Sequence, residues 1–263
     1  MSGITDGVIV KGRGPAVVCL HSTLNNAKQW QSLIDLLADK FTVIAIDLYN
    51  YGNAPKFIPS DSQPYNLVAE IARISAIVDR YVGAEKFHLV GHSFGGAVSL
   101  KYAQQVASQL LSLSLYEPVA FHFQLNDVEK KAAVDQLSQM LCSEDALAGC
   151  QFFIDFCNGK GAFQQLPVPV QQKLVQGLEL VKLNHFALLE ERYTLEVLSG
   201  INCSKLLMYG SQSHQLIIDL MHEMIAADSA IKHCEFNAGH MAPLTHAIEI
   251  NAEIERHLTS FNS

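Results

Sequence analysis

The sequence has few charged residues and no basic stretch. Only 17% of its 263 residues are Asp, Glu, Lys or Arg, and the acidic ones prevail, which leaves a formal net charge of −8. Nucleic acids and anionic membrane surfaces bind clusters of Lys and Arg, because those charges neutralise phosphates. The composition therefore argues against both kinds of partner. With 49% hydrophobic residues, it also excludes a disordered chain and predicts a compact globular protein.

Long hydrophobic runs are also missing. The apolar runs are about five to seven residues long, which is the length of a strand and far below the roughly 20 residues that cross a membrane. The first residues, MSGITDGVIVKG, contain no charged start followed by an apolar run. We therefore expect no signal peptide and no membrane association.

Paired cysteines are absent as well. The chain has six cysteines, and no two of them form a CxxC pair. Scattered cysteines favour reduced thiols in or near the core of a cytoplasmic protein, so neither a disulfide framework nor a metal site is expected. The six residues are Cys19, Cys142, Cys150, Cys157, Cys203 and Cys234.

Short apolar runs alternate with helix-like stretches along most of the chain. The runs are almost continuously hydrophobic, as strands of a parallel sheet must be when helices cover both faces. This alternation predicts an α/β fold with a doubly wound, mostly parallel sheet. The expected strands are 16–21, 41–47, 87–92, 110–117, 205–210 and 232–239, with a short edge strand at 7–12. The expected helices are 27–38, 66–82, 94–107, 214–227 and 244–258.

One segment of about seventy residues interrupts this alternation. It contains three helix-like stretches, separated by GKG and PVP, and no convincing strand. We expect a helical cap, residues 121–190, inserted into a core formed by residues 1–120 and 191–263. In open α/β sheets ligands bind outside the carboxyl ends of the strands, where such a cap would lie. Three aromatic residues are candidates to line a substrate pocket there, although each could equally pack a cap helix on the core: Phe121, Phe153 and Phe156.

The stretch LVGHSFGG, residues 89–96, contains the most informative motif. Ser93 lies between Gly91 and Gly95, after an expected strand and before an expected helix. Such a serine occupies a strained turn, where a neighbouring Cβ would collide with the strand or the helix. The pattern G-x-S-x-G in this context is the nucleophile elbow, which exposes a serine for attack on a carbonyl group. His92, inside the motif, is expected to have a structural role.

With this motif the chain resembles the α/β-hydrolase superfamily, in the branch that carries a helical cap. The resemblance covers nearly the whole chain and implies a Ser–acid–His triad, with Ser93 as nucleophile and His240 as general base. It also implies an oxyanion hole formed by the backbone N–H groups of Thr23 and Phe94, although Ser22 replaces the glycine that relatives usually have. The matching stretches are 17–30, 43–55, 91–96 and 237–243. His240 also follows the last expected strand, which places it independently at the same edge of the sheet.

The acid of this triad is absent from its usual place. Most relatives carry it three residues past the glycine of the strand matched here by 205–210, where this chain has Ser213. Some members, the haloalkane dehalogenases among them, carry it one strand earlier, and here that strand ends in Glu117. Because a carboxylate at the end of an apolar run is costly unless it is paired, Glu117 is our candidate acid. The alternative is a carboxylate at the surface. Asp47, which precedes the elbow, is expected to stabilise a turn.

These residues predict a serine hydrolase. The expected substrate is a small or medium, largely uncharged acyl compound, foremost a carboxylic ester, cleaved through an acyl-enzyme on Ser93. No metal and no organic cofactor are required. Thioesters, lactones and the carbon–carbon bond of a diketone stay open, and so does acyl transfer to another acceptor. An alternative from another class is a catalytically weak ligand-binding protein on a hydrolase frame, which the missing Asp at position 213 would fit. The substrate and the oligomeric state are left open.

Overall fold

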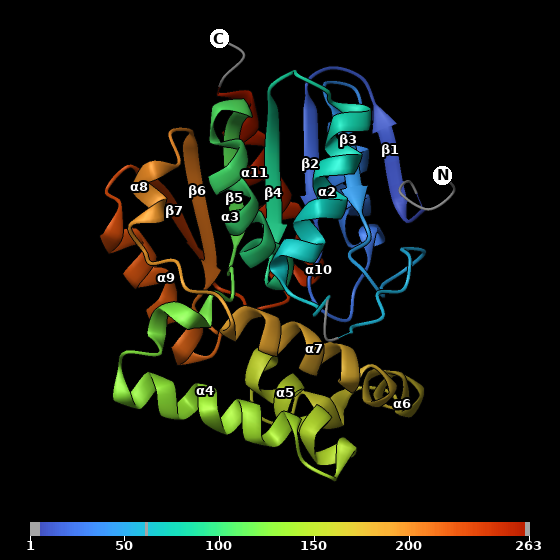
Figure 1. The fold of residues 1–263 in the computed structure, drawn as a ribbon, viewed down its shortest axis with the longest axis vertical. Coiled ribbons are helices and arrows are strands. Elements are labelled where there is room, and N and C mark those ends of the chain that lie inside the picture. Colours follow the sequence, from blue (N-terminus) through green and yellow to red (C-terminus); the bar gives the residue numbers. More distant parts are fainter. Residues whose placement is uncertain (1–5, 61–62, 261–263) are drawn as a thin grey trace.

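A seven-stranded sheet forms the centre of the structure, a computed structural model that describes residues 6–60 and 63–260 (Figure 1). The strand order is β1-β3-β2-β4-β5-β6-β7, and neighbours run parallel except at the edge, where β1 is antiparallel to β3. The expected doubly wound, mostly parallel sheet is thereby confirmed. The strands are β1 (Val8–Gly12), β2 (Ala16–Leu20), β3 (Thr42–Ile46), β4 (Phe87–His92), β5 (Leu110–Tyr116), β6 (Ser204–Gly210) and β7 (Ile231–Phe236).

Two hydrophobic cores lie on the two faces of this sheet. Successive side chains of a strand point to opposite faces, so Val18 and Leu20 of β2 join one core, whereas Val17 and Cys19 join the other. The first core is covered by α2 (Leu67–Tyr81), α3 (Phe94–Val106) and α9 (Gln215–Ala227). The second is covered by η1 (Ala27–Trp30), α1 (Gln31–Leu37), α10 (Ala242–Thr245) and α11 (Ala247–Thr259). This double cover explains the continuous hydrophobicity of the central strands.

Two of the expected helices are not uniform α-helices in the structure. The stretch 27–38 starts with a 3₁₀ turn, capped by the Asn26 side chain, which accepts a hydrogen bond from the backbone of Lys28, and continues directly as α1. The stretch 244–258 is divided at His246, whose φ of −128° and ψ of 39° are not helical. Helical residues therefore do fill the stretch expected at 27–38, whereas the expectation of one helix over 244–258 was wrong.

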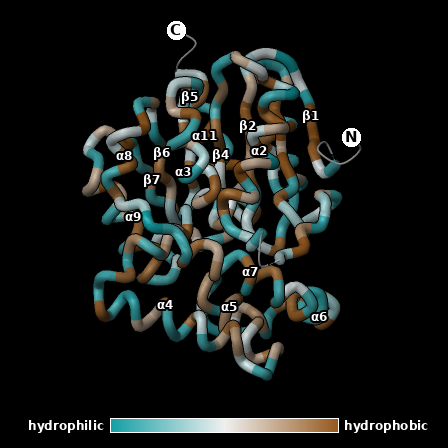
Figure 2. Tube along the Cα trace, viewed as in Figure 1, coloured by the Kyte–Doolittle hydropathy of each residue, from teal (hydrophilic) through white to brown (hydrophobic). Residues whose placement is uncertain are grey.

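A layer of further helices lies at the carboxyl ends of the parallel strands (Figure 1). It consists of η3 (Phe121–Gln124), α4 (Val128–Leu141), α5 (Ala146–Asn158), η4 (Phe163–Gln165), α6 (Val168–Gln176) and α7 (Leu178–Leu189). The short α8 (Val197–Gly200) follows in the chain but lies beside β6 and β7, outside this layer (Figure 1). Every residue between β5 and β6 is described, and none of them forms a strand. Hydrophobic and hydrophilic positions alternate along α4 and α6 (Figure 2), as in helices with one face in solvent.

The last of the three helix-like stretches expected in the layer forms two separate helices, α6 and α7. Gly177 separates α6 from α7, and a Cβ at this position would lie 2.5 Å from the side chain of Leu24. This close approach brings the layer against the loop that follows β2. None of the described helices combines the length and the apolarity that a membrane span needs. The expectation about a signal peptide depends in part on residues 1–5, which lie outside the described residues.

Candidate active site

Ser93 occupies a sharp turn between β4 and α3. Its φ of 56° and ψ of −121° lie in a region that residues other than glycine rarely adopt. A Cβ at Gly91 would lie 2.4 Å from the Ser99 Oγ, and a Cβ at Gly95 would lie 2.4 Å from the backbone oxygen of His21. The two glycines are therefore required by close packing, as the motif predicts. They hold Ser93 at the edge of the sheet where the strands end.

Ser93, His240 and Glu117 form one hydrogen-bonded chain. The Nε2 of His240 lies 2.8 Å from the Ser93 Oγ, and its Nδ1 lies 2.6 Å from the Glu117 Oε2. The three side chains are 6%, 3% and 0% exposed, respectively. Because an ionised carboxylate only accepts, Nδ1 carries the proton, and Nε2 accepts the hydrogen bond from the serine hydroxyl. Residues from the ends of β4 and β5 and from the loop after β7 thus meet at one point.

Glu117 is fully buried, so the alternative of a surface carboxylate was wrong. Its second oxygen, Oε1, accepts hydrogen bonds from the backbone N–H of Gly210 at 2.7 Å and from the hydroxyl of Ser213 at 2.6 Å. Its φ of 43° is in the left-handed region, and its own N–H donates to the Met208 oxygen. Three donors therefore compensate the buried charge. Ser213, at the position where most relatives carry the acid, donates to the acid of this chain.

A second set of buried polar groups supports the loop that carries His240. The Nε2 of His92 donates to the backbone oxygen of His240 at 2.9 Å, which leaves its Nδ1 to accept from the Gln29 amide at 3.1 Å. Burial lowers the pKa of His92 well below its usual value, so the ring is neutral. The Gln29 Oε1 accepts from both the N–H and the hydroxyl of Ser22. His92 is therefore structural, as expected, whereas the role of Gln29 was not foreseen.

The loop after β2 approaches Ser93 from the other side. Thr23 belongs to this loop and lines the space in front of Ser93, and Phe94 begins α3, where backbone N–H groups have no partner within the helix. The hydroxyl of Ser22 is bound within the loop by Gln29 and Asn25. Asp47 accepts hydrogen bonds from the backbone N–H groups of Ala27 and Asn53, at 2.6 and 2.7 Å, which is the turn-stabilising role expected of it.

Asn184 of α7 links the helical layer to this loop. Its Oδ1 accepts hydrogen bonds from Thr23 and Tyr51, and its amide donates to the Tyr65 hydroxyl, which donates in turn to Glu70. Burial raises the pKa of Glu70 to about 7. Asn184 is 2% exposed and also lines the space in front of Ser93. The only hint in the sequence is a polar residue within the apolar stretch LVKLNHFALL.

Two cavities meet at Ser93 and His240. The smaller, of about 30 Å³, is lined by the three aromatic residues expected at a pocket, Phe121, Phe153 and Phe156. The larger, of about 480 Å³, extends between α5, α6 and the loop after His240, and Phe153 also lines it. The surfaces of both cavities are mostly apolar. This arrangement suits a largely uncharged ligand.

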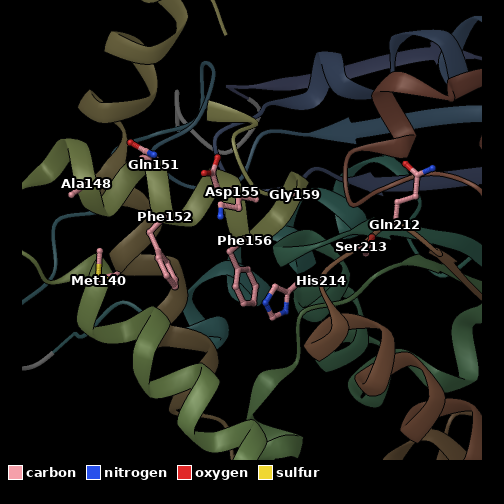
Figure 3. Close-up of a pocket in the computed structure, with 11 residues that line it drawn as sticks. Met140, Ala148, Gln151, Phe152, Asp155, Phe156, Gly159, Gln212, Ser213 and His214 are labelled. Atoms are coloured by element: carbon pink, nitrogen blue, oxygen red, sulfur yellow. The ribbon is translucent and has the colours of Figure 1, made fainter. Parts of the chain in front are cut away.

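A third, open groove of about 600 Å³ lies behind the smaller cavity, and neither Ser93 nor His240 lines it. Figure 3 shows its walls: Phe152 and Phe156 from α5 on one side, and Gln212, Ser213 and His214 on the other. The rings of Phe156 and His214 stack with a centroid distance of 4.0 Å. Within residues 6–60 and 63–260, no three His, Cys, Asp or Glu side chains are grouped so that they could hold a metal ion.

The geometry agrees with what comparison with known proteins shows. The model of the alpha/beta hydrolase family matches residues 17–253 of this chain. The chain belongs to the alpha/beta hydrolase family. This alpha/beta hydrolase is 29% identical over 130 residues to a fluoroacetate dehalogenase from Burkholderia sp, a match covering 49% of this chain and 43% of the dehalogenase. It is 30% identical over 141 residues to the human serine hydrolase-like protein, covering 51% of this chain and 66% of that protein.

Solved structures resemble this alpha/beta hydrolase over almost its whole length. A thermophilic esterase from Thermogutta terrifontis superposes with a TM-score of 0.74 at 19% identity, covering 96% of this chain and 92% of the esterase. The enol-lactonase from Burkholderia xenovorans LB400 superposes with a TM-score of 0.73 at 15% identity, covering 96% and 95%. At such identities the likeness is one of fold.

Proposed function

We propose that the protein is a serine hydrolase that cleaves a small or medium, largely uncharged carboxylic ester through an acyl-enzyme on Ser93. The observation that carries this proposal is the hydrogen-bonded chain from Glu117 through His240 to Ser93. It gives the serine a base, and it gives the base a carboxylate that orients the ring. The Asp missing at position 213 was the main argument for a weak binding protein, and Glu117 occupies the place of that Asp beside His240.

The expected reaction uses these groups in two steps. His240 takes the Ser93 proton as the oxygen attacks the ester carbonyl, and Glu117 stabilises the imidazolium that forms. The backbone N–H groups of Thr23 and Phe94 hold the negative oxygen of the tetrahedral intermediate. His240 then protonates the departing alcohol. A water molecule then enters and loses a proton to His240 as its oxygen attacks the acyl carbonyl, and His240 returns that proton to the Ser93 oxygen as the acid is released.

We further propose that residues 121–190 act as a cap on a core formed by 1–120 and 191–263. Support comes from the position of the helical layer at the carboxyl ends of the strands and from Phe121, Phe153 and Phe156, which line the smaller cavity. Ester cleavage also fits Ser93 better than dehalogenation does, despite the dehalogenase among the relatives. A serine that displaced a halide would form a stable ether, which water does not release, whereas an acyl ester on serine is readily hydrolysed.

A fluorophosphonate probe tests the proposal directly. It should label the wild-type protein at Ser93, and an aryl acetate should be hydrolysed with an initial burst if deacylation is slow. Ser93→Ala should be unlabelled and lose on the order of 10⁴-fold or more in turnover, with an unchanged melting temperature. A labelled Ser93→Ala variant, or one that hydrolyses the ester like wild type, would show that Ser93 is not the nucleophile.

A further inference from the structure

The two cavities that meet at Ser93 differ strongly in size and in access to solvent. Almost all residues around the smaller cavity are buried, among them Leu137, Leu188 and Ile217, which are at most 4% exposed. The larger cavity reaches the surface, because Val170 and Leu244 on its walls are 41% and 43% exposed. An ester bound at Ser93 therefore has one closed side and one open side.

The order of the chemical steps assigns the two halves of the ester to these sides. The alcohol must leave while the acyl group is still bonded to Ser93, and water must then reach His240. An alcohol held in the closed cavity would have to pass the acyl group in order to leave. In the open cavity it departs freely and leaves a path for water. His240 lines both cavities and can therefore protonate an alcohol held in the open one, whose walls also include Met241 and Leu244.

We propose that the substrates are short-chain acyl esters of long apolar alcohols, a specificity that rests on the proposed ester hydrolysis. The closed cavity, at about 30 Å³, has about the volume of one water molecule in the liquid, which is enough for the methyl part of an acetyl group but not for a long acyl chain. The open cavity, at about 480 Å³, is within the usual range for a drug-sized ligand. Its walls, with Leu166, Val170 and Leu174, favour an alkyl chain over a charged or sugar-like alcohol.

Phe156 sets the length of the acyl group in this arrangement. Its ring lines both the closed cavity and the open groove of about 600 Å³ behind it, so it is the wall between the two spaces. It stacks on the His214 ring and makes an edge-to-face contact with Phe121, at 6.2 Å between centroids. Phe152, on the same helix, lines the groove (Figure 3) but not the closed cavity. Removing the Phe156 ring therefore joins the closed cavity to the groove, whereas removing the Phe152 ring does not.

A pair of isomeric esters tests the assignment. Hexyl acetate and ethyl hexanoate have the same atoms and nearly the same hydrophobicity, but their long chains lie on opposite sides of the ester bond. We expect kcat/KM to be at least about tenfold higher for hexyl acetate, because a six-carbon acyl group does not fit the closed cavity. Equal rates, or a preference for ethyl hexanoate, would overturn the proposal.

Two variants locate the cause of this preference. Phe156→Ala should raise kcat/KM for ethyl hexanoate by about tenfold relative to hexyl acetate, whereas the matched control Phe152→Ala should leave the ratio as in wild type. If Phe156→Ala melts too early to assay, Phe156→Leu makes the same comparison with a smaller change. An unchanged ratio in a folded Phe156 variant would show that this ring does not limit the acyl group. If neither ester is cleaved and Ser93 takes no fluorophosphonate, the proposed hydrolase function itself fails, which is a different outcome from a wrong order of the two esters.

Discussion

At the scale of single residues, the carboxylate of Glu117 is held by three hydrogen bonds. Glu117 receives hydrogen bonds from His240, from the Gly210 backbone and from Ser213, so one residue connects the ends of β5 and β6 with the loop after β7. Its negative charge and its shape have separate effects, because an amide of the same size keeps most of the contacts. Substitutions at Glu117 and Ser213 can therefore separate the two effects.

Glu117→Gln should lower kcat strongly while the fold persists. The variant keeps the volume of the side chain but no longer stabilises the imidazolium, and it favours the wrong His240 tautomer when its amide faces Nδ1. A comparable Asp-to-Asn change in a serine protease costs about 10⁴-fold. Turnover of an aryl acetate and the melting temperature measure the two properties. Turnover at the wild-type rate would exclude Glu117 as the acid.

Ser213→Asp should have opposite effects in two backgrounds. In the wild type it places a second carboxylate where the hydroxyl now lies 2.6 Å from Glu117, so repulsion should reduce both activity and stability. In Glu117→Gln the same Asp faces a neutral amide and restores a negative charge near His240, so activity should rise. Measuring kcat for the four proteins of this cycle gives the coupling directly. If the effects of the two substitutions on the activation free energy simply add, Ser213 and Glu117 act independently.

At the scale of helices and strands, close packing at the elbow limits what the sequence tolerates. Gly95→Ala should destabilise the protein although alanine favours helices by about 1 kcal/mol over glycine. The added Cβ would lie 2.4 Å from the His21 oxygen and 2.6 Å from the Leu20 oxygen, both backbone atoms that cannot turn away. Gly200→Ala in α8 is the matched control, since no atom lies within 4 Å of its added Cβ. Chemical denaturation should show a lower unfolding free energy for the first variant alone, and equal stabilities would contradict the packing argument.

The strands could be predicted because burial on both faces leaves continuous apolar runs such as AVVCL in β2. The breaks at His246 and Gly177 could not, because neither residue prevents a helix by itself and the surrounding packing decides. The same limit applies to the site. Ser93 and His240 have recognisable local motifs, whereas Gln29 and Asn184 act through partners that are 63 and 161 residues away in the chain. A polar residue within an apolar stretch marks Asn184 in the sequence, but nothing near it indicates which partners it has.

The molecule as a whole should lose stability in mild acid because of its buried imidazoles. Burial lowers the pKa of several histidines from 6.5 to about 4, so each favours the folded state above pH 6.5, and this contribution is lost as the pH falls toward 4. The residues are His21, His88, His122, His185 and His257. Glu70 acts in the opposite direction, because its raised pKa stabilises the folded state as the pH falls below about 7. The carboxyl group of Glu70 is opposed by five imidazoles, so the net effect of acid on these groups is destabilisation of the folded state.

We therefore expect the unfolding free energy to fall between pH 6.5 and pH 4, by up to about 1.4 kcal/mol per histidine for each unit of its shift. Urea denaturation at several pH values measures this slope. Replacing the buried His185 by Gln should flatten the slope, whereas the same change at the exposed His246 should not. A stability that is constant over this range would contradict the expectation.

The strained backbone at the elbow has a consequence for the competition between stability and activity. Ser93 holds a conformation that costs on the order of 1–3 kcal/mol for a residue with a Cβ, and only glycine adopts it freely. Ser93→Gly should therefore melt later than Ser93→Ala, which keeps the Cβ and the strain, while both lack the hydroxyl. A laboratory selection for thermal stability alone would then favour loss of this serine. Such a selection keeps an active enzyme only if turnover is selected at the same time.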